Sequence, residues 1–149
     1  MEEKKIEVVS SVDVSGSSVS DWQKLFGHMR VYDSNFNEEH FPLEPEDKVR
    51  PVIRKQFSDT ATGYDRLRWA ESQGLELALS RATGLELKAD PQLLMTQRVV
   101  GGGQWRHRGG HEYVPVFLRF DGKPVVGLDW LDFDFVPSYV WLFSPKSGT

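Results

Sequence analysis

Three side chains in this chain have types and spacing suited to acid–base chemistry: His111, Asp132 and Asp134. An aspartate that accepts a hydrogen bond from an imidazole orients the ring and raises its basicity, which would make His111 a general base. The alternative is a cross-strand ion pair at the end of a hairpin, which contributes about 0.2–1 kcal/mol. Because we find no nucleophile in a strained turn and no second cluster of metal ligands, we favour the ion pair.

A hairpin is the element that would bring these side chains together. Asp121-Gly122 separates two runs rich in β-branched and aromatic residues. This dipeptide favours a two-residue type I′ turn, because both of its positions need positive φ. We therefore predict strands over 112–120 and 123–131.

The two-residue turn also fixes the register of the hairpin. Tyr113 would face Trp130, and, if the pairing continues, His111 would face Asp132 with Asp134 further along the same side. An aromatic pocket between the sheet and a long helix could then bind a small molecule, with the histidine and the aspartates at its mouth. A small enzyme or small-molecule-binding domain is therefore one functional hypothesis, an alternative to the leading one given below.

The loop before the hairpin, 104–111, is rich in basic and aromatic side chains. It contains Trp105, Arg106, His107 and Arg108, a composition found in contacts with anions or single-stranded nucleic acid. The same side chains could instead form a hairpin loop that lies over an acidic part of the protein, and the net charge of −4 favours this interpretation. Nucleic-acid binding is therefore the third hypothesis.

The sequence predicts neither a metal site nor a cofactor. His107 and His111 have the spacing of helical zinc ligands, but Gly109-Gly110 between them disfavours a helix. A glycine-rich pattern at 98–103 resembles a pyrophosphate loop, yet no helix is expected to follow it.

An acidic segment, 33–47, lies in the first third of the chain. Its acidic residues are Asp33, Glu38, Glu39, Glu44, Glu46 and Asp47. Long segments without regular structure tend to be functional or mobile. We weigh a solvated loop against a binding surface for a basic partner and favour the loop.

Composition limits the class of protein. With 149 residues, 39% hydrophobic and 27% charged, the chain suits one soluble domain. It has no cysteine, so disulfides and thiolate metal sites are excluded. A net charge of −4 makes a nucleic-acid partner unlikely, and no apolar run approaches a membrane span. We expect a cytoplasmic protein without a membrane segment.

Periodicity predicts the remaining elements. Alternation predicts a strand over 5–14, and Ser20 with Gln23 forms a capping box that begins a helix over 21–29. A long helix is predicted over 62–83, although Gly74 could split it. Helical spacing allows a short helix over 49–57, and a strand is predicted over 92–100.

The predicted fold is a single α+β domain. A mostly antiparallel sheet of four or five strands would be packed on one face by the 62–83 and 21–29 helices. The aromatic segment 139–143 could form an edge strand that pairs with a second copy of the chain. The leading functional hypothesis is a small non-enzymatic binding or accessory protein that engages a macromolecular partner, with a homodimer as one form. The contacts would come from the 33–47 segment, the 104–111 loop, or both.

Overall fold

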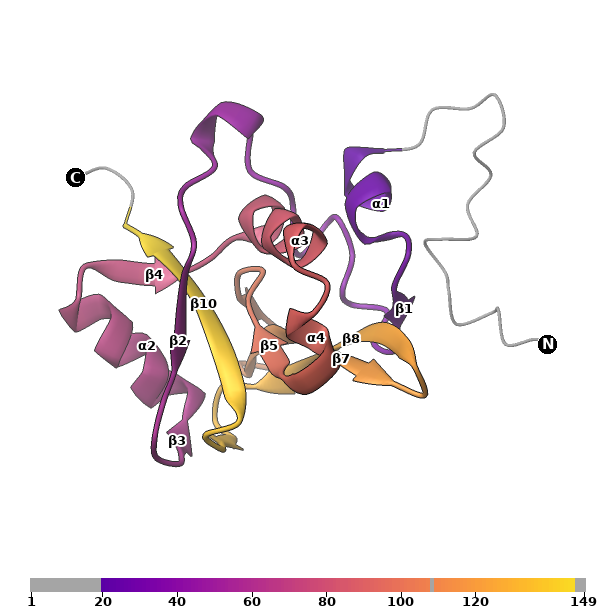
Figure 1. Ribbon diagram of the computed structural model, residues 1–149. Helices are drawn as coiled ribbons and strands as arrows, with labels where there is room; N and C mark the ends of the chain where they lie inside the picture. The colour runs from indigo at the N-terminus through magenta and orange to yellow at the C-terminus, as the bar shows by residue number, and fades with distance from the viewer. Residues whose placement is uncertain (1–19, 108, 147–149) are drawn as a thin grey trace, which may run out of the picture.

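The computed structural model describes residues 20–107 and 109–146 (Figure 1). The strand predicted over 5–14, and Arg108 of the basic loop, lie outside the described residues. Within the described part of the chain, no helix is long and apolar enough to cross a membrane.

The first helix, α1 (Asp21–Phe26), begins as the sequence predicts. Ser20 Oγ accepts from the Gln23 amide, and Gln23 Oε1 accepts from the Ser20 amide, which completes the capping box. The apolar residues of the helix, Trp22, Leu25 and Phe26, are at most 7% exposed. The helix ends at Phe26, before the predicted end at 29, and Met29 is buried in the turn that follows it.

The predicted hairpin is also confirmed. Strands β7 (Glu112–Phe120) and β8 (Lys123–Trp130) pair antiparallel, and Tyr113 faces Trp130. Asp121 and Gly122 have φ values of +55° and +77°, as a type I′ turn requires.

The hairpin belongs to a larger sheet than the sequence predicted. In the described chain, eight strands form one mixed sheet with the main order β1-β8-β7-β5-β10-β2, while β4 pairs with β10 and β6 pairs with β7. The other six strands of this sheet are β1 (Arg30–Val31), β2 (Ile53–Gln56), β4 (Leu75–Leu77), β5 (Arg98–Val100), β6 (Trp105–Arg106) and β10 (Tyr139–Pro145). A separate two-stranded sheet joins β3 (Ala61–Thr62) to β9 (Asp134–Phe135).

The prediction of a four- or five-stranded, mostly antiparallel sheet is therefore wrong. Two pairs, β1 with β8 and β5 with β10, are parallel. The possibility that 139–143 forms an edge strand is also ruled out, because β10 lies between β5 and β2 and pairs with β4 as well. In Figure 1 this strand, in yellow, runs between β2 and β5. Short strands such as β1 and β4 carry too little alternation to be recognised in the sequence.

The single helix predicted over 62–83 is wrong too. Helix α2 (Gly63–Ser72) begins next to the predicted start, with a capping box at Thr62. Gly74 then adopts φ +73° and turns the chain into β4, after which α3 (Ser80–Ala89) begins. The predicted end of the helix at residue 83 is wrong as well, because this residue lies inside α3.

Two other segments differ from the prediction. The 49–57 segment contains β2, although its spacing allowed a short helix. The 92–100 segment begins with a short helix, α4 (Leu93–Thr96), before β5. Short apolar runs do not distinguish a buried helix from a strand by periodicity alone.

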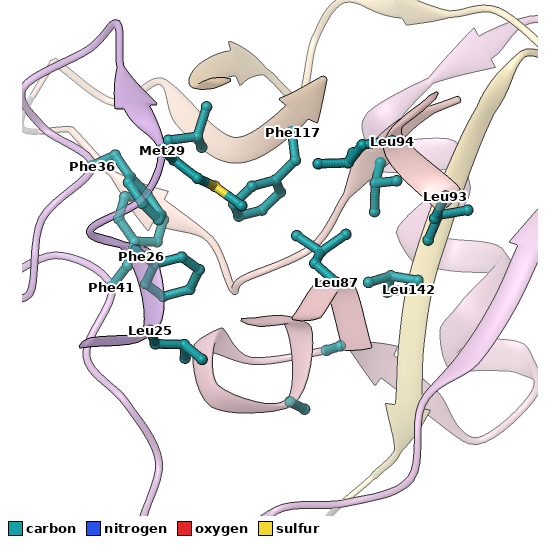
Figure 2. Close-up of a cluster of buried hydrophobic side chains, with 14 of the residues drawn as sticks. Leu25, Phe26, Met29, Phe36, Phe41, Leu87, Leu93, Leu94, Phe117 and Leu142 are labelled. Atoms are coloured by element: carbon teal, nitrogen blue, oxygen red, sulfur yellow. The ribbon is translucent and has the colours of Figure 1, made fainter. Parts of the chain in front are cut away.

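Both faces of the sheet are covered, which corrects the prediction of helices on one face. Alternate residues of β10 belong to different cores: Val140 and Leu142 to the first, Trp141 and Phe143 to the second. Residues from α1, α3 and α4 contribute to the first core, which Figure 2 shows around Phe117, and Ala70 of α2 contributes to the second. Strands buried on both faces lose the simple apolar–polar alternation that the prediction relied on.

Candidate functional site

The basic loop forms the turn of a second hairpin, between β6 and β7. His107 N donates to His111 O at 2.8 Å, and Gly110 N donates to His107 O at 2.8 Å. Gly110 has φ +99°, a conformation that glycine adopts at low cost in a hairpin loop of this length. Gly110 therefore serves a tight turn.

This second hairpin places three aromatic rings side by side at the end of the sheet opposite the Asp121-Gly122 turn. Trp105 pairs with Tyr113, and Tyr113 pairs with Trp130. The ring centroids are 5.7 Å apart for the first pair and 6.2 Å apart for the second. All three side chains are half-buried, so part of each remains accessible.

Three imidazoles extend this row of rings. His40 stacks on Trp105 with centroids 4.1 Å apart, and His111 stacks on Trp130 at 4.3 Å. His107 meets the edge of Trp105 at 5.4 Å.

Phe133 completes the row. It is 51% exposed and lies 5.2 Å from Trp130. We call the following set the ring surface: His40, Trp105, His107, His111, Tyr113, Trp130 and Phe133.

The predicted acid–base pair takes a different form in the structure. His111 is exposed and stacked on Trp130, and no hydrogen bond or ion pair joins it to Asp132 in the described chain. Regular pairing of β7 with β8 ends at Tyr113 and Trp130. Asp132 is exposed in the turn that follows, and Asp134 lies on β9, where it pairs with Thr62.

The 33–47 segment brings His40 to the ring surface because its apolar residues are anchored in the first core. Phe36 and Phe41 are 1% and 2% exposed. Phe41 O accepts hydrogen bonds from Trp22 Nε1 and Ser80 Oγ, each at 3.0 Å. The acidic segment and the basic loop thus meet at one surface, through the contact of His40 with Trp105.

Part of the acidity of this segment has a structural role. Glu44 Oε1 accepts from the Arg81 amide at 2.7 Å, and Oε2 accepts from the Ala82 amide at 3.0 Å. These amides lie in the first turn of α3, where Leu79 at the N-cap position makes no side-chain hydrogen bond. A carboxylate there satisfies unpaired donors and interacts favourably with the helix dipole. Glu38 and Glu39 remain exposed beside His40 in the sequence.

A cluster of polar side chains surrounds Glu112, whose neighbour Tyr113 belongs to the ring surface. Tyr64 on α2 donates its hydroxyl to Glu112 Oε1 at 2.8 Å. Gln104 and Arg106 approach Glu112 Oε2 at 3.4 and 3.6 Å. Burial and then the neighbouring carboxylate of Glu112 raise the pKa of Tyr64 to about 12. The cluster ties the second hairpin to α2 and counters the charge of Arg106.

A recess of about 330 Å³ lies at one end of the ring surface. It is lined by Asn35, His40, Trp105, Arg106 and His107. Among the described residues, no three histidine, aspartate or glutamate side chains gather closely enough to hold a metal ion. The polar side chains that line the recess carry imidazole, amide and guanidinium groups.

Sequence reasoning identified most of these positions and missed others. Trp105, Arg106, His107, Tyr113 and Trp130 were binding candidates, and all lie on or beside the ring surface. His40 and Asn35 were missed because only tertiary packing brings their segment to β6. Tyr64 could have been suspected as an aromatic in the first turn of a predicted helix, but nothing in the sequence indicated its partner.

No family model matches the chain, and searches of curated proteins and of solved structures found no significant match. Function is therefore inferred from the geometry of the ring surface and its surroundings.

Proposed function

We propose that this chain is a non-enzymatic binding protein that engages a protein partner through the ring surface. The observation that carries the proposal is the row of half-buried rings Trp105, Tyr113 and Trp130 on three neighbouring strands. Tryptophan, tyrosine and arginine dominate the energetic centres of protein interfaces. Large rings with few rotatable bonds bury apolar area at a low cost in conformational entropy.

Charge favours a partner that presents basic side chains. The chain has a net charge of −4, and three exposed carboxylates flank the rings in the sequence: Glu38, Glu39 and Asp132. An arginine or lysine of the partner could lie over an indole ring and pair with one of these carboxylates.

A nucleic-acid partner fits the same surface less well. Phosphates need an excess of cations, and the guanidinium of Arg106 already lies 3.6 Å from the Glu112 carboxylate. The exposed carboxylates that flank the rings in the sequence would also repel a phosphate backbone. A basic protein is therefore the partner we propose.

The first test compares partners captured by the wild-type protein and by Trp130→Ala in extracts of the source cells. Met95→Ala is the matched control, because Met95 is an exposed apolar residue (53%) outside the ring surface. A candidate lost by Trp130→Ala and retained by Met95→Ala is then purified, and its dissociation constant is measured for all three proteins. We expect Trp130→Ala to weaken binding about thirtyfold or more, as for an energetic centre of an interface.

Salt dependence tests the charge of the partner. Raising the salt from about 0.05 M to about 0.5 M should weaken binding of a basic partner, because screening shortens the range of charge attraction. The proposal is wrong if Trp130→Ala captures and binds the same proteins as the wild type. Recovery of an acidic partner whose binding ignores salt would overturn the choice of a basic one.

A further inference from the structure

The recess beside Trp105 contains two histidines whose hydrogen bonds fix opposite roles for their free nitrogens. His40 Nδ1 lies 3.1 Å from Asn35 O. A carbonyl oxygen only accepts, so Nδ1 carries the proton in this contact. In the neutral ring, Nε2 of His40 is then a hydrogen-bond acceptor.

His107 has the reverse arrangement. The Gly109 amide donates to His107 Nδ1 at 3.0 Å, so this nitrogen must present its lone pair. The neutral ring then carries its proton on Nε2, which is a donor. Two imidazoles that line one recess thus offer an acceptor and a donor.

The other polar groups of the recess do not make it an anion site. Arg106 is partnered by the Glu112 carboxylate at 3.6 Å and by Gly110 O at 3.3 Å. The side-chain amide of Asn35 makes no hydrogen bond within the described residues, and it can both donate and accept. The recess therefore offers both hydrogen-bond donors and hydrogen-bond acceptors to a ligand.

We propose that this recess binds a primary carboxamide, the side chain of a glutamine or asparagine presented by the partner protein. The amide NH₂ would donate to His40 Nε2, and the amide oxygen would accept from His107 Nε2. This assignment rests on the proposed function, because the partner delivers the side chain while its other residues cover the ring surface.

Hydrogen-bond complementarity distinguishes the carboxamide from groups of the same shape. A carboxylate has no donor for His40 Nε2 and would place a lone pair against a lone pair. An apolar group of similar size would leave both imidazoles without a partner, which is costly once water is excluded. Sites built to bond polar groups reject such isosteres strongly.

The test uses blocked amino acids as probes and needs no identified partner. N-acetyl-glutamine methylamide, N-acetyl-glutamate methylamide and N-acetyl-methionine methylamide are titrated into isotope-labelled full-length protein at about pH 8, where ordinary imidazoles are neutral. Ring signals of His40 and His107 are followed by NMR. We expect the glutamine probe to shift both rings and to bind roughly tenfold more tightly than the other two.

Two variants separate the recess from the rest of the ring surface. His40→Phe keeps a ring to stack on Trp105 but removes the acceptor, and we expect it to lose the preference for the glutamine probe. His28→Phe is the matched control, because His28 is exposed and lies outside both the recess and the ring surface. Its probe affinity should equal that of the wild type, and thermal melting verifies that both variants fold.

Several outcomes would overturn the assignment. The first is that the glutamate or the methionine probe binds as tightly as the glutamine probe. The second is that His40→Phe binds the glutamine probe with the affinity of the wild type. The third is that no probe shifts the NMR signals of either histidine ring. Failure of the wider proposal is distinguishable. Selective glutamine binding combined with partner capture that ignores Trp130→Ala would reject the ring surface as the interface and keep the carboxamide site.

Discussion

The two ends of the β7–β8 hairpin carry similar side chains in different surroundings. Phe117 and Tyr113 are four residues apart on β7 and therefore point to the same face of the sheet. Phe117 is fully buried and contacts the rings of Phe26 and Phe36, at 5.9 and 5.8 Å. Tyr113 is half-buried between Trp105 and Trp130. Aromatic residues thus stabilise the core at one end and remain available for binding at the other.

The largest expected effect is on stability, and it tests the difference between the two ends of the hairpin directly. Phe117→Ala should lower the free energy of unfolding by about 3–5 kcal/mol, because it leaves a cavity beneath α1. Tyr113→Ala removes two cross-strand contacts and should cost only about 1 kcal/mol. Urea unfolding of both variants tests the difference, and equal losses would show that the ring surface is part of the core.

The second prediction concerns the close packing of α1 against α3 at the buried end of the hairpin. A Cβ on Gly84 would lie 2.4 Å from the Leu25 side chain, so Gly84→Ala should destabilise by about 1–3 kcal/mol through overpacking of α1 against α3. Gly127→Ala on β8 is the control, since its Cβ would meet nothing within 4 Å, and a change within about 0.5 kcal/mol is expected.

A second substitution tests the cause of that loss. Adding Leu25→Ala to Gly84→Ala should destabilise by less than the two single changes together, which a double-mutant cycle measures. Strict additivity of the two losses would contradict the packing explanation.

The third prediction tests the cap that Glu44, in the 33–47 segment, provides for α3. Glu44→Ala removes the acceptors for the Arg81 and Ala82 amides, and a loss of about 1 kcal/mol is expected from denaturant unfolding. Glu38→Ala, an exposed acidic residue of the same segment, should change stability by less than about 0.5 kcal/mol. Similar values for both would mean that the carboxylate of Glu44 does not cap the helix.

The smallest expected effect is on the titration of Tyr64, which lies beside the ring surface. The pKa of Tyr64 is raised to about 12, so the last step of a tyrosinate absorbance titration should disappear in Tyr64→Phe. The neutral phenol stabilises the fold below its ordinary pKa of about 10, and this contribution is lost as the pH rises through about 12. Tyr32→Phe, at an exposed tyrosine, should leave that last step in place.

Local signals in the sequence were sufficient for one hairpin and for two helix starts. Asp121-Gly122 determines its turn through the backbone preference of two residues, and the capping boxes at Ser20 and Thr62 depend on contacts three residues apart. Gly74 was recognised as a position that could split a helix, but its positive φ could not be inferred from spacing. The sheet order could not be derived because β10 pairs with strands far away in the chain.

The candidate site shows the same division. Tyr113 and Trp130 follow from the register of the hairpin, and Trp105 was a candidate from composition. The stacking of His40 on Trp105 depends on the anchoring of Phe36 and Phe41, which is a tertiary property. The register of the hairpin, extended by two residues, predicts that His111 pairs with Asp132. In the structure the imidazole of His111 stacks on the large apolar face of Trp130 instead.

The position of β10 has a consequence for how the chain folds. This strand pairs with β2, β4 and β5, which are all synthesised before it. During translation these three strands therefore wait for a shared neighbour until residues 139–145 leave the ribosome, and the sheet closes late through contacts distant in sequence. Topologies with such distant pairings fold slowly, and β2 and β4, whose partner in the described chain is β10, stay open to aggregation until it is in place.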